Sequence, residues 1–101
     1  MLEQEESHGE LSLPPIAENS AAVEVLRVWA VPGEGQEYSV RPIWEDPGVW
    51  GLLLVDLARH VAYAYEQQGM RGEDALWRIK EMFDAEWSAP TDPPDNVSTQ
   101  Q

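Results

Sequence analysis

The stretch that decides the fold runs from Arg41 to His60 and reads RPIWEDPGVWGLLLVDLARH. Asp46 and Pro47 predict a helix start within it. An aspartate can accept an unpaired backbone N–H at the N-cap, and a proline at the first helical position lacks an N–H that would go unpaired there. Gly69 is the residue type that commonly follows a helix end. We therefore expect a helix over residues 47–68.

Apolar side chains recur along this predicted helix at spacings of three and four residues, the repeat of one helix face. That face holds Trp50, Leu53, Leu54, Leu57, Val61, Ala64 and Tyr65. Trp44 lies just before the helix and Trp50 lies in its first turn, so the two indoles are placed to contact each other as an enlarged hydrophobic staple. Such a contact would fold the helix back over the segment that precedes it.

Two predicted strands precede this helix. Residues 22–31, AVEVLRVWAV, are rich in β-branched and bulky side chains, and residues 37–43, EYSVRPI, alternate polar and apolar. The intervening PGEGQ, residues 32–36, has the composition of a turn. We expect the strands to pair as an antiparallel hairpin across a five-residue loop.

The hydrophobic pattern favours a hairpin register in which Val31 pairs with Glu37. In that register Arg27 and Arg41 face each other, and like charges directly opposite destabilise a sheet. A carboxylate from a second subunit, or a bound anion, would relieve the repulsion, with Trp29 stacked on a guanidinium. The alternative is a pair of solvated arginines that splay apart.

A second helix is predicted over residues 73–87, EDALWRIKEMFDAEW. Glu73 and Asp74 favour its start through the helix dipole, and Pro90 prevents its continuation. The order strand, strand, helix, helix predicts an α+β domain over residues 22–87. We expect two layers, an antiparallel β-hairpin packed against a helical hairpin.

The two ends of the chain differ from this segment in composition. Residues 1–21 hold five glutamates and no lysine or arginine, and residues 88–101 hold three prolines and two aspartates. Segments of low hydrophobicity and one-sided charge bury too little apolar surface to offset the entropy of ordering. The sequence predicts a disordered acidic N-terminal tail and a disordered proline-rich, polar C-terminal tail.

The small size of the predicted domain favours a homodimer. A domain of roughly 60 residues buries only about 60% of its unfolded surface, and this chain has no cysteine to add a disulfide. The strand over residues 22–31 is apolar on both faces, which is typical of a strand covered on both sides. For one of the two faces, the chain has no segment left that could cover it. The candidate interface residues are Val23, Val25, Trp29, Val31 and Trp77.

The formal net charge of −13 disfavours two classes of partner. An acidic protein repels the phosphates of nucleic acids and the surfaces of anionic membranes. The longest apolar run, GLLLV, is far shorter than a membrane span. The N-terminal residues lack the basic and apolar regions of a signal peptide, so we expect a cytoplasmic protein with neither nucleic-acid nor membrane partners.

Catalytic and metal-binding motifs are weak in this sequence. His60 follows Asp56 by one helical turn, so a carboxylate could orient the imidazole as in an acid–base pair. A partly exposed histidine beside a helical neighbour is the simpler interpretation, because no nucleophile motif accompanies it. The acidic residues of the predicted helices match no metal-ligand spacing. We assign no catalytic residue, no metal and no cofactor.

The segments LRVW, WEDPGVWGLLLVDLARHVAYAY and MFDAEW resemble a family of short alphaproteobacterial proteins of unknown function. The resemblance covers most of residues 23–92, and its most specific part is WGLLLVDLARH. It implies a bacterial source and no particular activity. The leading hypothesis is a non-enzymatic protein that associates with itself and acts as a protein-interaction module. The alternative is a binder of small anionic ligands, with its site at Arg27 and Arg41 or between protomers; an enzyme is the third class.

Overall fold

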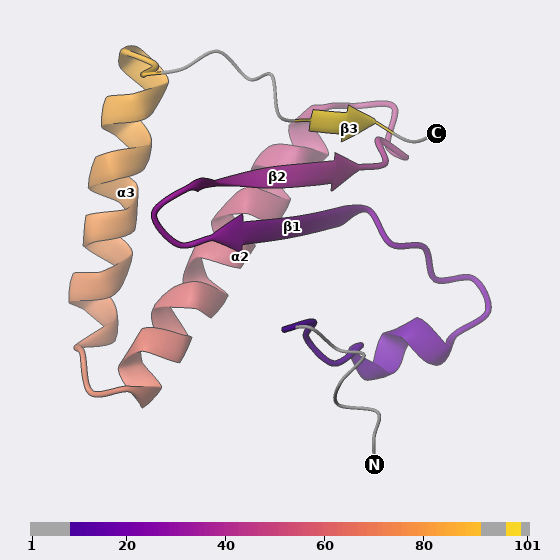
Figure 1. The fold of residues 1–101 in the computed structure, drawn as a ribbon, viewed down its shortest axis with the longest axis horizontal. Coiled ribbons are helices and arrows are strands. Elements are labelled where there is room, and N and C mark those ends of the chain that lie inside the picture. Colours follow the sequence, from indigo (N-terminus) through magenta and orange to yellow (C-terminus); the bar gives the residue numbers. More distant parts are fainter. Residues whose placement is uncertain (1–8, 92–96, 100–101) are drawn as a thin grey trace.

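A computed structural model describes residues 9–91 and 97–99 of the chain. The elements follow in the order η1 (Pro15–Glu18), β1 (Leu26–Val31), β2 (Gly35–Val40), α2 (Gly48–Gln67), α3 (Gly72–Ser88) and β3 (Val97–Thr99) (Figure 1). An antiparallel hairpin followed by two helices confirms the predicted α+β class. In the described part of the chain, no helix is both long and apolar enough to cross a membrane.

The turn between β1 and β2 is tighter than predicted. Val31 pairs with Gly35, so three residues close the turn instead of five, and the N–H of Glu34 donates to the carbonyl of Val31 at 2.8 Å. Gly33 and Gly35 have φ values of 84° and 130°, a region that glycine enters without the steric penalty of a Cβ. The two glycines therefore allow the shorter turn.

The shorter turn shifts the register of the whole hairpin by two residues. Arg27 pairs with Ser39, so the predicted pairing of Arg27 with Arg41 is wrong. Arg41 follows the ladder and donates its backbone N–H to the carbonyl of Val25 at 2.9 Å. Because side chains alternate between faces with a period of two, an even shift leaves every side chain on its predicted face. The two arginines share a face but lie diagonally rather than opposite each other.

A third strand, β3, was not predicted. It pairs in parallel with β2, with Tyr38 opposite Val97 and Val40 opposite Thr99, so the sheet order is β1-β2-β3. At the other end of the sheet, β1 begins at Leu26, later than the predicted start at residue 22. The predicted tails extend over residues outside the described part of the chain, and disorder of the two ends stays a prediction.

Local signals set both ends of α2 much as the sequence indicates. The helix begins at Gly48, whose N–H donates to Oδ1 of Asp46 at 2.9 Å. Asp46 therefore accepts a hydrogen bond from an otherwise unpaired N–H, as predicted. At the other end Gly69 has a φ of 109°, and the N–H of Met70 donates to the carbonyl of Tyr65 at 3.2 Å. This is the bonding of a glycine-terminated helix end.

The predicted contact between Trp44 and Trp50 is confirmed. Their ring centroids lie 5.4 Å apart with an interplanar angle of 76°, the edge-to-face arrangement that aromatic pairs prefer. Both side chains are half-buried. The pair fixes the entry of the chain into α2, which runs behind the hairpin in Figure 1.

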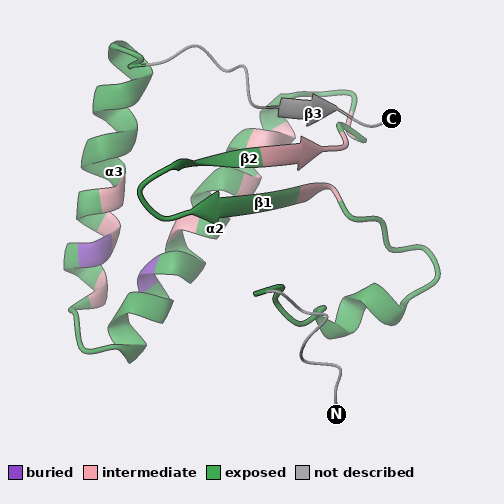
Figure 2. Cartoon of the chain, in the orientation of Figure 1, coloured by how far each residue is buried: buried purple, intermediate pink, exposed green. Residues whose placement is uncertain are grey.

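Tight packing is confined to the end where α2 and α3 are connected. Ala62 and Ala75 are the buried residues of the described chain, each 4% exposed (Figure 2). Their small side chains let the two helices approach closely. Larger apolar side chains are at most half-buried, among them Leu26, Val40, Leu53, Leu76 and Ile79. None of the large side chains in the described residues is fully enclosed.

Candidate functional site

Few side chains of the described residues are enclosed. Ala62 and Ala75 are buried, each 4% exposed, whereas many large apolar side chains are exposed. The packing of the chain on itself therefore leaves much of its surface open.

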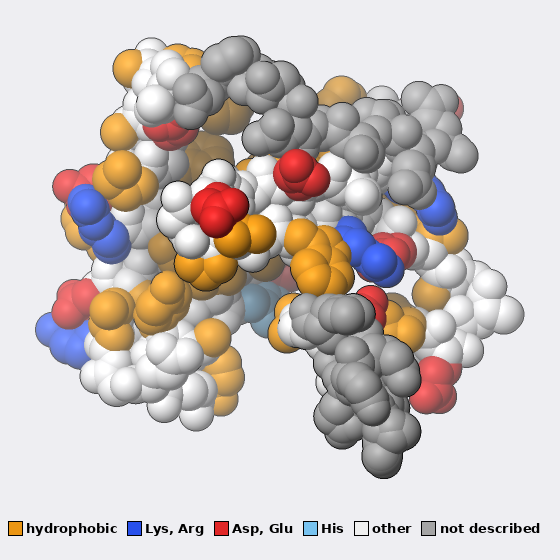
Figure 3. Space-filling model, viewed as in Figure 1, with side chains coloured by type: hydrophobic (Ala, Val, Ile, Leu, Met, Phe, Trp, Pro, Cys, Tyr) orange, Lys and Arg blue, Asp and Glu red, His pale blue; other side chains and the backbone are white. Residues whose placement is uncertain are grey.

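Much of this surface is apolar. Exposed large apolar side chains occur on β1, α2 and α3. They are Val28, Trp29 and Val31 on β1, Leu52, Leu54, Val55, Leu57, Val61, Tyr63 and Tyr65 on α2, and Trp77, Met82, Phe83 and Trp87 on α3. Orange side chains gather between α3 and the hairpin in Figure 3. Soluble monomers rarely expose large contiguous apolar patches, and such patches commonly mark interaction surfaces.

On α3, the buried stripe continues into an exposed one. Ala75 is buried and Ile79 half-buried, but Phe83 and Trp87, which follow Ile79 at intervals of four residues, are 46% and 76% exposed. Each such interval turns the position by about 40° around the helix, so Trp87 lies about 120° from Ala75. The two aromatic rings stack on each other, with centroids 5.7 Å apart and an interplanar angle of 19°. The two helices diverge toward this end (Figure 1), so α2 does not cover the stack.

On α2, the apolar stripe that starts at Trp50 is covered only at its beginning. Leu54, Leu57 and Val61 follow it at spacings of four, three and four residues, which places them on the same side of the helix. All three are exposed. The predicted core face of this helix is thus half-buried near its start and open further along.

The opposite side of α3 is charged and already paired. Nη1 of Arg78 lies 2.8 Å from Oε1 of Glu81, and Nζ of Lys80 lies 2.7 Å from Oδ2 of Asp84. All four side chains are more than half exposed, so the pairs are solvated and each contributes little to stability. The charged side chains of α3 thus pair with each other within the helix, while its large apolar side chains stay exposed.

The predicted interface residues lie on β1, on the segment before it and on α3. Val23, Trp29 and Val31 are exposed and Val25 is half-buried, all in or before β1. Trp77 is 70% exposed, but it lies two residues from Ala75 and therefore about 160° around α3 from the buried stripe. Phe83 and Trp87 were not predicted to be exposed, because their helical spacing is that of core positions.

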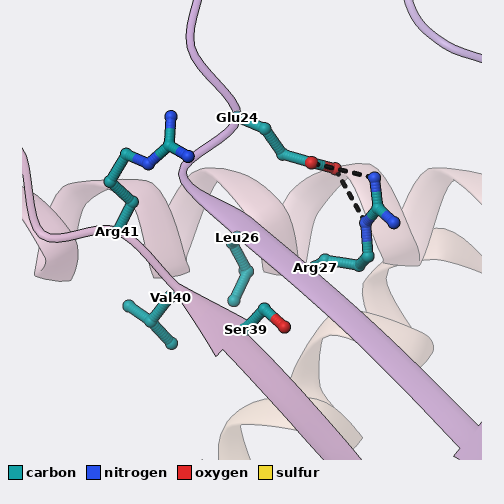
Figure 4. A pocket seen from close by; sticks show the side chains of 6 residues that line it. All are labelled: Glu24, Leu26, Arg27, Ser39, Val40 and Arg41. Atoms are coloured by element: carbon teal, nitrogen blue, oxygen red, sulfur yellow. Dashed lines mark hydrogen bonds and ion pairs between the residues drawn. The ribbon is translucent and has the colours of Figure 1, made fainter. Parts of the chain in front are cut away.

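A second feature is an open pocket of about 210 Å³ at the far end of the hairpin from its turn. It is lined by Glu24, Leu26, Arg27, Ser39, Val40 and Arg41 (Figure 4). Arg27 donates from Nη2 to Oε1 of Glu24 at 2.9 Å and from Nε to Oε2 at 3.1 Å. This hydrogen-bonded carboxylate raises the pKa of Arg27. Arg27 therefore already has a negative partner within its own chain.

Arg41 lies in a different environment in the same pocket. In Figure 4 its guanidinium is on the other side of Glu24 from Arg27. Its Nε is screened from solvent and has no hydrogen-bond partner among the described residues. An unpaired buried donor costs about 1–3 kcal/mol, so this nitrogen is a candidate contact for an acceptor. Trp29, predicted to stack on a guanidinium, pairs with Glu37 across the strands and does not line the pocket.

Asp56 and His60 lie one turn apart on α2, as expected, but their contact is not that of an acid–base pair. Nδ1 of His60 lies 2.8 Å from the backbone carbonyl oxygen of Asp56. The ring is thus oriented by the helix backbone rather than by the carboxylate. Within the described residues, no three histidine or acidic side chains are grouped so that they could hold a metal ion.

Comparison with known proteins gives a family and a structural relative. Residues 10–91 match the family DUF5076, described as a domain of unknown function. A solved structure from the photosynthetic bacterium Rhodopseudomonas palustrus CGA009, provisionally named a pyruvate dehydrogenase, is 43% identical, with a TM-score of 0.70. The match covers 89% of this chain and 94% of that one. No curated protein matches the chain.

Proposed function

The chain belongs to the DUF5076 family, and we propose that it is a non-enzymatic interaction module of the bacterial cytoplasm that works as a homodimer. The observation behind this proposal is the absence of an enclosed core: among the described residues, Ala62 and Ala75 alone are buried. Two alanines supply little of the apolar burial that stabilises a domain. Covering the exposed apolar side chains of α2, α3 and β1 requires a second surface.

The kind of side chain left uncovered is typical of an obligate interface, which buries roughly 2,000–5,000 Å² in total over both partners. Obligate interfaces resemble a domain core cut in half, and the half-buried Trp50, Leu53 and Leu76 fit that description. Folding and association of such a chain are coupled.

Sedimentation equilibrium of the full chain at micromolar concentration tests the proposal. We expect a single species of twice the chain mass of 11.4 kDa. A monomer at these concentrations, with cooperative unfolding and high thermal stability, would overturn the proposal because the chain would then be stable without further cover.

The pocket at Arg41 supports a second candidate function, binding of a small oxyanion. The screened Nε lacks an acceptor among the described residues, and a guanidinium offers parallel donors to a carboxylate or phosphate. Glu24 already neutralises Arg27, which leaves Arg41 as the cationic group that the pocket offers.

Thermal denaturation with inorganic phosphate, at constant ionic strength, tests this candidate. Phosphate should raise the midpoint of the wild type but not of Arg41→Gln. Arg59→Gln, which removes an exposed arginine of α2, is the matched control and should respond as the wild type does. An equal response in all three proteins would rule the pocket out.

The surroundings of His60 and Arg27 favour a non-enzymatic role. The His60 ring contacts a backbone carbonyl rather than a carboxylate, and Nε and Nη2 of Arg27 donate to Glu24. Neither arrangement presents a group poised for acid–base chemistry, so the module proposal assigns no catalytic residue.

A further inference from the structure

We infer that the pocket at Arg41 binds a small, singly charged carboxylate in preference to phosphate. This inference rests on the oxyanion site proposed above and names the class of ligand that fits it. The residues that carry it lie in or beside β1 and β2, so it does not depend on how the chain associates.

Arg41 differs from most basic residues of the chain in having no carboxylate beside it. The chain has 6 lysines and arginines against 19 aspartates and glutamates. Four of the six have a carboxylate oxygen within 2.9 Å: Arg27, Arg71, Arg78 and Lys80. Arg41 and Arg59 have no such partner among the described residues, but Arg59 is exposed whereas Arg41 is half-buried. A partly buried charge is costly unless it is paired, so an anion from outside contributes most at Arg41.

Arg27 and Glu24 show, in the same pocket, the kind of contact that Arg41 lacks. Nε of Arg27 donates to Oε2 of Glu24 at 3.1 Å and Nη2 donates to Oε1 at 2.9 Å, so one edge of the guanidinium holds both oxygens of a carboxylate. The corresponding Nε of Arg41 is screened from solvent and has no acceptor among the described residues. A carboxylate bound through this edge lies in the plane of the guanidinium, whereas phosphate places further oxygens outside that plane. Because the surroundings of Nε already exclude water, the flatter group fits better.

The charges of the pocket favour a ligand with one negative charge. Two arginines and one glutamate line it, so two positive groups and one negative group give the pocket a net charge of +1. A carboxylate neutralises this charge. A phosphate dianion exceeds it, next to the carboxylate of Glu24 and in a chain whose formal net charge is −13, and like charges at short range repel.

The size of the pocket and its hydroxyl group agree with a small acid. The volume of about 210 Å³ is below the range of about 300–1,000 Å³ that is typical of sites for drug-sized ligands. Ser39 lies opposite Arg27 in the hairpin and lines the same pocket. Its hydroxyl can donate a hydrogen bond to a carboxylate oxygen without adding charge.

Thermal denaturation of the full chain with sodium acetate and with sodium phosphate tests the preference. The two salts are compared at equal ionic strength and at a pH well above the second pKa of phosphate, so that phosphate is a dianion. Phosphate also stabilises folded proteins without binding to a site, so the shift of the midpoint in Arg41→Gln is subtracted from that in the wild type. We expect the apparent dissociation constant to be at least about threefold higher for phosphate than for acetate, the order of effect that one additional unit charge has at close range in a solvated pocket.

Two variants separate the geometry of Arg41 from the charge of the pocket. Arg41→Lys keeps the positive charge but lacks Nε and the planar guanidinium, so acetate should no longer bind more tightly than phosphate. Glu24→Gln removes the negative charge beside the ligand, so phosphate binding should improve relative to acetate. Arg59→Gln is the matched control and should keep the wild-type preference. A wild-type preference in Arg41→Lys would overturn the inference.

The Nε–H signals of the arginines in proton–nitrogen NMR spectra give a second readout, which decides the question if Arg41→Gln does not fold. Acetate should shift the Nε–H signal of Arg41 and leave that of Arg59 in place. If phosphate binds as tightly as acetate or more tightly, the preference for a carboxylate is overturned and the oxyanion site remains. If neither anion has an effect that depends on Arg41, the oxyanion site itself is overturned.

Discussion

The two ends of the helical hairpin of α2 and α3 differ in how their apolar residues are used. At the connected end, Ala62 and Ala75 are buried between helices that lie close together. At the open end, Phe83 and Trp87 are large, stacked and exposed, where α3 has diverged from α2 (Figure 1). The side chains buried between the two helices are thus small, while two large aromatic side chains stay exposed.

This difference indicates where the stability of the protein originates. Full burial of a large apolar side chain contributes about 1.5–3 kcal/mol, and an alanine contributes much less. The alanines at the connected end therefore fix how α2 and α3 pack. Most of the stabilisation available from further apolar burial lies with the exposed side chains at the open end. On this account, substitutions at the connected end act on each chain, and substitutions at the open end act on assembly.

The largest effect should follow from Ala62→Asp at the connected end. The carboxylate would be left without a partner between two packed helices, and an uncompensated buried charge costs about 3–5 kcal/mol. Urea denaturation followed by circular dichroism should show a loss of this size in the free energy of unfolding. Ala85→Asp, on an exposed part of α3, is the matched control. A similar loss in both variants would mean that the connected end is not closely packed.

A smaller loss is expected for Trp44→Ala, which removes half of the indole pair before α2. The pair packs the segment before α2 against the first turn of the helix, and its ring contact contributes about 0.5–1.5 kcal/mol beyond the buried area. Because Trp44 is half-buried, we expect a total loss of about 2 kcal/mol in the free energy of unfolding. Trp77→Ala, which removes a 70% exposed indole, should cost much less. Equal losses of stability in the two variants would show that the contact between Trp44 and Trp50 does not stabilise the fold.

The smallest of these effects is expected for Asp46→Ala at the start of α2. Its Oδ1 accepts the N–H of Gly48 at 2.9 Å, and loss of such a cap costs about 1 kcal/mol. Asp46→Asn keeps an acceptor and should retain most of the stability. The cap lies away from the open end, so neither variant should change the dimer dissociation constant. If Asp46→Asn changed the dimer dissociation constant, the start of α2 would contribute to the interface. The two ends of the helical hairpin would then not act separately.

Elements that depend on local chemistry could be predicted from the sequence. Asp46 and Gly69 set the ends of α2 close to the predicted positions, and Trp44 contacts Trp50 as the spacing indicates. The hairpin register could not be predicted, because a period of two cannot distinguish registers that differ by two residues. The choice depended on the turn, where Gly33 and Gly35 permit a tighter closure than composition alone indicates.

The candidate sites also could be predicted only in part. The opposed pair of Arg27 and Arg41 was a consequence of the predicted register, and the structure moves them to diagonal positions in one pocket. Glu24, which pairs with Arg27, was missed because strand alternation places residues three apart on opposite faces. The exposure of Phe83 and Trp87 was not predicted, because helical spacing gives the same pattern for a side chain that is covered and one that is not.

The most direct test of the account is the dependence of thermal stability on protein concentration. If the large apolar residues are covered by a second copy, unfolding includes dissociation, and the midpoint must rise with total chain concentration. We expect a continuous rise from low micromolar to high micromolar concentration in the wild type, with a single cooperative transition. A midpoint that stays constant over this range, in a protein that sediments as a monomer, would contradict the account.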